Sequence, residues 1–316
     1  AYVDMAREPR RPVIDMMNAM GYDVATLGNH EFDYGFDRFL EIVNGDNTPY
    51  VSANLWDKTA DKAVLDAYKL FTVGDKKVAV VGITTPETLV KSTPAFFQNA
   101  AGEYIYDFCN DTTGEKLYNI VQKAVDAAKA EGADYVIAVG HLGIDEQSSP
   151  WMSKEVIANT TGFDAFIDGH SPEPWRSTDL IANTTGIDAV LDGHSHSTIA
   201  MELVKNKDGK EIPVAQTGTQ LKNVGKLTIK TDGTITHENI DLSAVEEDAD
   251  AKAYIAGITD KFDALQKQVV AKTSVELTIN GADGKRAVRN AETNLGDLCA
   301  DAYRILLGAD IAFVNG

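Results

Sequence analysis

Residues 115–143 read EKLYNIVQKAVDAAKAEGADYVIAVGHLG. In the first part of this stretch, Glu115–Ala130, apolar residues recur at the spacing of one helix face, which predicts an amphipathic helix. The run Asp134–Val139 that follows is short, apolar and rich in β-branched residues, as in a strand buried on both faces. A helix that leads directly into a buried strand is the building unit of an α/β layered fold.

The same alternation extends to both sides of this unit. Upstream we expect helices at Pro12–Met20 and Phe36–Val43 and extended segments at Asp23–Leu27, Tyr50–Ala53 and Lys77–Ile83. Downstream the sequence pattern changes, and it predicts a β-meander with turn signals at Asp208-Gly209 and Asp232-Gly233. Its expected strands are Ile199–Val204, Ile212–Ala215, Lys222–Lys230 and Thr234–Ile240, and a polar, helix-prone stretch, Ala249–Gln266, comes after them.

Composition narrows the class of protein. The chain has 316 residues, 44% of them hydrophobic, and a net charge of −19 from 29 Lys plus Arg against 48 Asp plus Glu. That balance argues against binding to a nucleic-acid polymer or to an anionic membrane surface, since both depend on basic side chains. No apolar run approaches the roughly 18 residues of a membrane span. The two cysteines, Cys109 and Cys299, form neither a CxxC motif nor a disulfide framework.

A tandem repeat lies in the middle of the chain. Residues Trp151–Ser171 and Trp175–Ser195 align at an offset of 24, with 14 identities in 21 positions. Each copy predicts a short helix, a glycine turn and a strand that ends in Asp-Gly-His-Ser. We expect one strand position in the sheet to hold one copy, so that the other loops out at a modest entropic cost and leaves Phe163–Ile167 without a partner.

Five of the six histidines follow strand-like runs, and most of them come directly after a glycine. They are His30, His141, His170, His194 and His196. Ligands of open α/β sheets bind outside the carboxyl ends of the strands, and imidazole is a common ligand of divalent transition metals. A single histidine in this place more often serves as a core hydrogen-bonding group. Five in the same context predict a metal site.

His30 has a carboxylate, Asp33, three residues further along the chain. A carboxylate at this spacing can hydrogen-bond an imidazole, fix its tautomer and stabilise its protonated form, and such a pair can act on a phosphoryl group. The alternative is a local turn that Asp33 caps.

Three blocks together resemble a known family. They are Gly28–Gly35 (GNHEFDYG), Gly140–Gly143 (GHLG) and Asp192–His196 (DGHSH), and Gln216–Gly218 and Val224–Leu227 fit the same pattern. They resemble the calcineurin-like metallophosphoesterases, and the tail Arg289–Leu298 is similar to the opening of the 5'-nucleotidase C-terminal domain. The resemblance implies an α/β fold with a two-sheet catalytic core over 1–245, which holds the duplication at 151–195. A linker helix over 246–268 and the start of a substrate domain over 269–316 would follow.

The resemblance also implies roles for the histidines. Asn29, His141 and His194 match the ligands of one metal ion and His196 matches a ligand of a second, while His30 and Asp33 match the pair that acts on the phosphate. Two divalent ions, whether Zn, Mn, Co, Fe or Mg, would polarise a phosphoryl group and activate water. They would also let a strongly acidic chain bind an anionic nucleotide.

The repeat leaves a choice between two sets of histidines. Copy one offers His170 alone, because Pro172 stands where the second histidine should be, whereas copy two offers His194 and His196. We therefore expect copy two to fill the site.

The implied reaction is metal-dependent hydrolysis of nucleotide phosphate esters of the 5'-nucleotidase type. Substrate binding would involve Arg289, Arg286, Lys285 and Asn294, and relatives of this kind are exported to the periplasm, the cell wall or the medium. Two family blocks are missing, the Asp-x-His of the first strand and the Gly-Asp of a later loop. Asp168-Gly169-His170 and Asp192-Gly193-His194 read Asp-x-His but belong to the later block, so no bridging aspartate is assignable. This leaves two alternatives open: a non-catalytic fragment, or a relative that hydrolyses 2',3'-cyclic nucleotides or nucleotide sugars.

Overall fold

The computed structural model describes residues 12–45, 47–169, 175–193 and 195–314. The chain divides into two compact units, Ala1–Lys252 and Ala253–Gly316.

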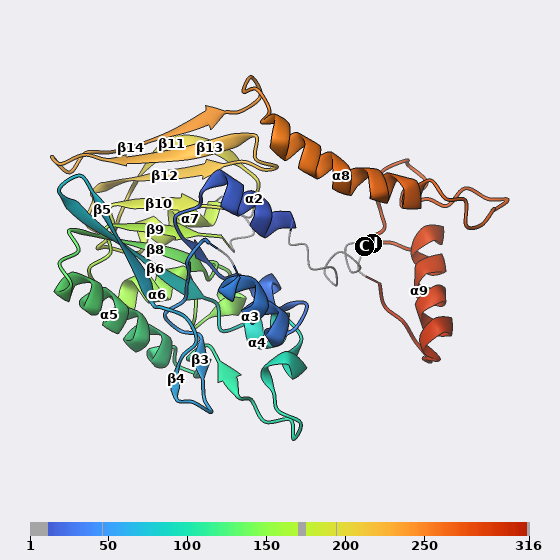
Figure 1. Ribbon diagram of the computed structural model, residues 1–316, viewed down its shortest axis with the longest axis horizontal. Helices are drawn as coiled ribbons and strands as arrows, with labels where there is room; N and C mark the ends of the chain where they lie inside the picture. The colour runs from blue at the N-terminus through green and yellow to red at the C-terminus, as the bar shows by residue number, and fades with distance from the viewer. Residues whose placement is uncertain (1–11, 46, 170–174, 194, 315–316) are drawn as a thin grey trace. The chain divides into compact units, whose positions relative to one another are not determined.

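A seven-stranded sheet forms the centre of the first unit, in the order β11-β12-β10-β9-β8-β6-β5 (Figure 1). Five neighbouring strands, from β12 to β6, run parallel, and the edge strands β5 and β11 run antiparallel to their neighbours. The carboxyl ends of the five parallel strands therefore meet at one edge. The strands are β5 (Tyr68–Val73), β6 (Lys76–Thr84), β8 (Tyr135–His141), β9 (Ala165–Asp168), β10 (Ala189–Asp192), β11 (Thr198–Lys205) and β12 (Glu211–Thr217).

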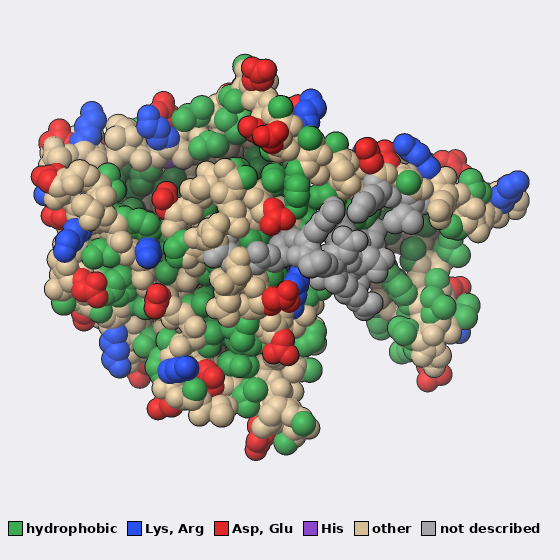
Figure 2. Space-filling view, in the orientation of Figure 1, with side chains coloured by type: hydrophobic (Ala, Val, Ile, Leu, Met, Phe, Trp, Pro, Cys, Tyr) green, Lys and Arg blue, Asp and Glu red, His purple; other side chains and the backbone are tan. Residues whose placement is uncertain are grey.

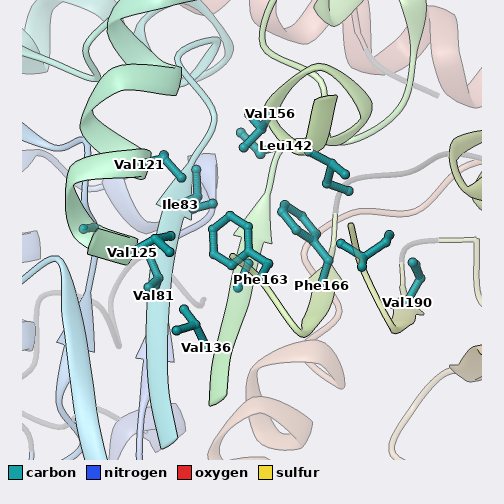
Figure 3. Packing of buried hydrophobic residues seen from close by; sticks show 14 of the residues in the cluster. Val81, Ile83, Val121, Val125, Val136, Leu142, Val156, Phe163, Phe166 and Val190 are labelled. Carbon is teal, nitrogen blue, oxygen red and sulfur yellow. The ribbon is translucent and has the colours of Figure 1, made fainter. Parts of the chain in front are cut away.

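Three helices pack on one face of this sheet and share one hydrophobic core with it: α5 (Glu115–Ala130), α6 (Ser153–Asn159) and α7 (Trp175–Ala182). Val121 and Val125 of α5 lie over the strand residues Val81 and Val136 (Figure 3). The apolar stripe read from the sequence of this helix is thus its buried face.

The opposite face carries a second core, built largely from phenylalanines. Phe32 packs against Phe36, Phe39, Phe97 and Phe108 with ring centroids 4.6 to 5.8 Å apart. The elements here are α2 (Pro12–Met20), β1 (Ala25–Thr26), η1 (Asn29–Phe32), α3 (Phe36–Asn44), β2 (Tyr50–Val51), α4 (Thr88–Lys91), η2 (Pro94–Phe97) and a small sheet of β4 (Lys62–Ala63), β3 (Trp56–Asp57) and β7 (Tyr106–Asp107). This core holds η1 in place, and η1 carries Asn29 and His30.

The expected meander is divided between two sheets. Strands β11 and β12 join the main sheet, whereas β13 (Asn223–Ile229) and β14 (Ile235–Asp241) pair only with each other and contact β11 and β12. The chain changes direction at Gln220 and Leu221, which both have positive φ. Asn239 of β14 donates hydrogen bonds to the carbonyl oxygens of Ile199 and Gln216, and so fastens the hairpin to the main sheet.

The prediction that one repeat copy loops out is wrong. Both copies are complete helix–strand units, α6–β9 and α7–β10, and their strands pair in parallel with Ala165 opposite Ala189. Phe163 and Phe166, which the sequence left without a partner, are buried in the main core (Figure 3). The physical reason is that a parallel strand has two hydrogen-bonding edges, so a repeated strand can pair with its own copy and lengthen the sheet.

In the second unit, α8 (Ala249–Gln266) contains the division at Lys252, and α9 (Asn294–Leu307) follows a loop segment. Thr293 caps α9 by accepting the N–H of Gly296, and Gly308 ends it with φ 61°. The predicted domain boundaries at 245 and 268 stay predictions. No helix in the described part of the chain has the length and apolar character to cross a membrane.

Candidate active site

The candidate site lies at the edge where the parallel strands end. In register, Thr84 of β6 lies opposite His141 of β8, Gly140 opposite Asp168 of β9, and Asp192 of β10 opposite Gln216 of β12. This is the edge at which the sequence predicted a ligand site.

Asn29 and His141 meet at this edge. Oδ1 of Asn29, a residue only 4% exposed, lies 2.9 Å from Nε2 of His141. Gly28 makes the approach close, because a Cβ at this position would lie 3.2 Å from Cε1 and Nε2 of His141. The two residues are 112 positions apart in the chain, so their contact is a product of the fold.

His30 projects from the same short helix, η1, and is accessible to solvent. Its Nδ1 lies 2.8 Å from Oδ2 of Asp33, and its side chain is 77% exposed. The predicted hydrogen bond between these two residues is therefore present. The contact engages Nδ1 and leaves the rest of the exposed imidazole accessible to solvent.

The predicted ligand His194 and the alternative His170 lie outside the described residues. His196 is exposed and has φ 61°. The end of copy two is held by Gln216, whose Nε2 donates to the carbonyl oxygen of Gly193 at 2.8 Å and whose Oε1 accepts the hydroxyl of Ser195 at 2.9 Å.

The donor set suits a divalent ion in part. A carboxamide oxygen and an imidazole nitrogen placed side by side, as in Asn29 and His141, are donors that zinc, manganese and iron accept. Among the described residues, however, no group of three His, Cys, Asp or Glu side chains has the geometry to hold a metal ion. Asn29 and His141 thus fit one end of a coordination shell, and their role as ligands stays a prediction.

Two features of the site were missed in the sequence. Glu31 accepts the N–H of Gly28 at 2.6 Å, and desolvation raises the pKa of its carboxyl group against the lowering effect of that hydrogen bond. Asn54 is fully buried and ties the end of β6 in place, because its Oδ1 accepts the N–H of Thr84 and its Nδ2 donates to the carbonyl oxygens of Thr84 and Phe108. The polar residues Ser52 and Asn54, which follow an extended segment, were the sequence signal for the role of Asn54.

The predicted substrate-binding residues belong to the second unit. Lys285, Arg286 and Arg289 are all exposed. Asn294 is engaged at both ends of its amide: Oδ1 accepts the N–H of Thr278 and Nδ2 donates to the carbonyl oxygen of Glu276. A structural role in this loop accounts for Asn294, and the binding role of all four residues stays a prediction.

Comparisons with known proteins point to one group. The family model described as "Bacterial capsule synthesis protein PGA_cap" matches residues 8–215. A snake venom 5'-nucleotidase of Gloydius brevicauda is 31% identical over 306 residues, which cover 92% of this chain and 46% of the relative.

Solved structures agree with the relatives. The 5'-nucleotidase precursor of Thermus thermophilus is 26% identical with a TM-score of 0.61, over 94% of this chain and 54% of that one. The calcineurin-like phosphoesterase YfkN of Bacillus subtilis shares the fold at 23% identity, with a TM-score of 0.51 over 81% of this chain and 75% of that one. The chain spans about half the length of the curated relatives it matches.

The matched family model covers more than half of the chain, the nucleotidase relatives align along nearly all of it, and the fold is that of the solved phosphoesterases. The chain therefore belongs to the family that the PGA_cap model describes, and its relatives and its fold support the predicted kinship with the calcineurin-like metallophosphoesterases of the 5'-nucleotidase group.

Proposed function

We propose that the protein hydrolyses phosphate esters of nucleotides with the help of two divalent metal ions, and that its site is the strand edge at His141. The observation that carries this proposal is the contact of Asn29 with His141, with the His30–Asp33 pair beside it on the same short helix. The description of the matching family, capsule synthesis, names a process and no reaction, whereas the nucleotidase relatives name one.

Each described residue has a distinct part in this proposal. Asn29 and His141 would hold one ion together with a histidine of the repeat, for which the sequence predicts His194, and His196 would contribute to a second ion. When bound, the ions supply Lewis-acid chemistry that polarises the phosphoryl group and activates water. His30 binds a phosphate oxygen through Nε2, and Asp33 fixes its tautomer and stabilises the imidazolium.

The charge of the protein is consistent with a small substrate. Acidic and basic side chains are interspersed over the face drawn in Figure 2, and the chain as a whole carries −19. A nucleotide would be attracted by the bound cations rather than by the protein surface. Lys285, Arg286 and Arg289 stay proposed contacts of the substrate's phosphate. The venom origin of a relative supports export of the protein.

The test is phosphate release by the purified chain in the presence of Mn²⁺ or Zn²⁺. The substrates are a nucleoside 5'-monophosphate, a 2',3'-cyclic nucleotide and a nucleotide sugar, so that the two kinds of relative are separated. We expect release from the 5'-monophosphate, loss of release with a chelator, and a fall in kcat of roughly 10²- to 10⁴-fold for His30→Ala. Turnover that survives complete removal of metal would refute the proposal, and metal binding without turnover would favour the non-catalytic alternative.

A further inference from the structure

We propose that the first copy of the repeat, not the second, forms the site edge beside His141, and that Asp168 is the positioning residue that fixes the turn after His141. This inference names the copy that adjoins His141, and it rests on the proposed function only where metal binding is the readout.

The carboxylate of Asp168 joins three segments. Its Oδ1 accepts the N–H of Leu142 at 2.9 Å and its Oδ2 accepts the N–H of Gly143 at 2.9 Å. The hydroxyl of Ser153 and the N–H of Gly169 donate to the same carboxylate. Asp168 is 5% exposed, and these four donors satisfy both of its buried oxygens.

This arrangement controls the backbone that carries His141. The two N–H groups that follow His141 are both bound to one buried side chain, and Gly143 turns the chain with φ 74°. Hydrogen bonds to a charged acceptor are stronger than those between neutral groups. The orientation of the His141 ring toward Asn29 therefore depends on Asp168.

Two glycines of the repeat show which copy adjoins His141. A Cβ at Gly169 would lie 3.4 Å from Nδ1 of His141. Among the described residues, a Cβ at Gly193, the same position in copy two, would meet only the carbonyl oxygen of Asp168 and the Cα of Gly169, both at 3.7 Å. Copy one thus faces His141, and copy two faces copy one.

The second copy repeats the residues but not the role. Asp192 accepts the hydroxyl of Ser177 and the N–H of Gly193, the counterparts of Ser153 and Gly169. The N–H groups of Leu142 and Gly143, in contrast, donate their hydrogen bonds to Asp168 of the first copy. Strand β10 pairs with β9 and β12, so it lies one strand further from β8, a step of about 4.8 Å.

The repeat supplies its own matched control, because Asp168→Asn and Asp192→Asn make the same change in the same local sequence. Each replacement puts an amide NH₂ in place of one carboxylate oxygen and weakens the hydrogen bond to the serine of its own copy. Hydrogen exchange of the Leu142 and Gly143 amides is then measured by NMR on the full chain without metal. We expect Asp168→Asn to speed this exchange roughly tenfold or more, and Asp192→Asn to leave it unchanged.

Calorimetric titration with Mn²⁺ is the second readout. We expect Asp168→Asn to weaken binding by roughly 10- to 100-fold, as for other residues that orient metal ligands. Equal effects of the two substitutions on exchange at 142 and 143 would overturn the inference. If the exchange results hold while the parent chain binds no Mn²⁺, the proposed function fails and the role of Asp168 stands.

A second pair of variants covers the case in which Asp168→Asn does not fold. Gly169→Ala adds a methyl group against the His141 ring, whereas Gly193→Ala adds one at ordinary contact distance from copy one. Gly169→Ala is expected to shift the NMR signals of the His141 ring and to weaken Mn²⁺ binding at least several-fold, and Gly193→Ala to leave the His141 signals unchanged. A larger effect of Gly193→Ala than of Gly169→Ala on the His141 signals would contradict the assignment to copy one.

Discussion

At the scale of single residues, the exposed pair of His30 and Asp33 offers a direct test of the proposed function by mutation. Asp33→Asn removes the charge that holds Nδ1 of His30 while the turn of η1 remains. We expect kcat for nucleotide hydrolysis to fall by roughly 10- to 100-fold with little change in KM, since Asp33 orients His30 and does not touch substrate. Asp37→Asn, an exposed carboxylate in the first turn of α3, is the control and should match the parent. Equal losses in both variants would contradict the pairing.

Glu31 makes the stability of the site depend on pH. Desolvation raises the pKa of its carboxyl group above 4.5 in the folded chain, so the folded state binds this proton more tightly than the unfolded state. Its contribution to stability is therefore full below pH 4.5 and is lost as the pH rises through the folded pKa. Relative to the parent chain, Glu31→Gln should become more stable as the pH rises through this window. Urea unfolding of both chains from pH 4 to 7 measures the difference, and parallel curves would contradict it.

Cys109 should be a slow thiol. It is half-buried, and desolvation together with the neighbouring Asp107 raises the pKa of its thiol to about 12. Because the thiolate is the reactive form, Cys109 in a Cys299→Ser chain should react with iodoacetamide at pH 8 at least about tenfold more slowly than a free cysteine. Mass spectrometry over time gives the rate, with glutathione as the reference. Modification at the rate of glutathione would contradict the shift.

At the scale of elements, the sequence predicted what depends on local pattern. The helix Glu115–Ala130 has the predicted bounds, and the strand expected at Lys77–Ile83 is β6, because periodic burial is written into neighbouring residues. The edge strand β5 was missed, since its residues are half-buried or exposed and include no buried run. The fate of the repeat was also mispredicted. Local sequence gives the shape of each copy but not which edges are free to pair.

Removal of one repeat copy tests the layout of the sheet. Deletion of residues 151–174 should bring β10 beside β8 in a six-stranded sheet, with Asp192 bonded to the amides of Leu142 and Gly143. The strand that leads to His194 and His196 then lies about 4.8 Å closer to His141, so Mn²⁺ should bind more tightly than in the parent chain. Calorimetry measures the affinity.

The same deletion has a cost in stability. Val190 and Ile187 would take the places of the buried Phe166 and Phe163, which should lower the free energy of unfolding by roughly 2–4 kcal/mol. Deletion of residues 175–198 is the control, since it keeps both phenylalanines and loses His194 and His196. Weaker Mn²⁺ binding after deletion of 151–174 than in this control would contradict the layout.

At the scale of the whole molecule, metal binding should stabilise the folded chain. A ligand that binds only the folded state, at 100 times its Kd, adds about 2.7 kcal/mol to the free energy of unfolding. In a chain of this size Mn²⁺ should therefore raise the Tm by several degrees, and His141→Ala should abolish most of the rise. A thermal scan with and without chelator measures it. A Tm that is the same with Mn²⁺ and with chelator would contradict the metal site.

The family and the α/β fold could both be predicted from the sequence, because motifs such as GNHEFDYG and DGHSH are contiguous and distinctive. The contact between Asn29 and His141 followed only from the expectation that strand ends converge, and the structure brings these residues together. The part of Asp168 could not be predicted. The local sequence Asp-Gly-His-Ser is the same at Asp168 and at Asp192, so it does not distinguish their roles. The roles differ because β9, and not β10, pairs with β8.

The pairing of both copies within one sheet has a genetic consequence. The two hydrogen-bonding edges of the strand in each helix–strand module are complementary, so the strand of one module can pair in parallel with the strand of another. An in-frame gain or loss of a module by unequal recombination would leave a chain whose neighbouring strands still find partners. The number of modules in such a gene can therefore change without loss of folding. Each added module places the downstream histidines one strand further from β8.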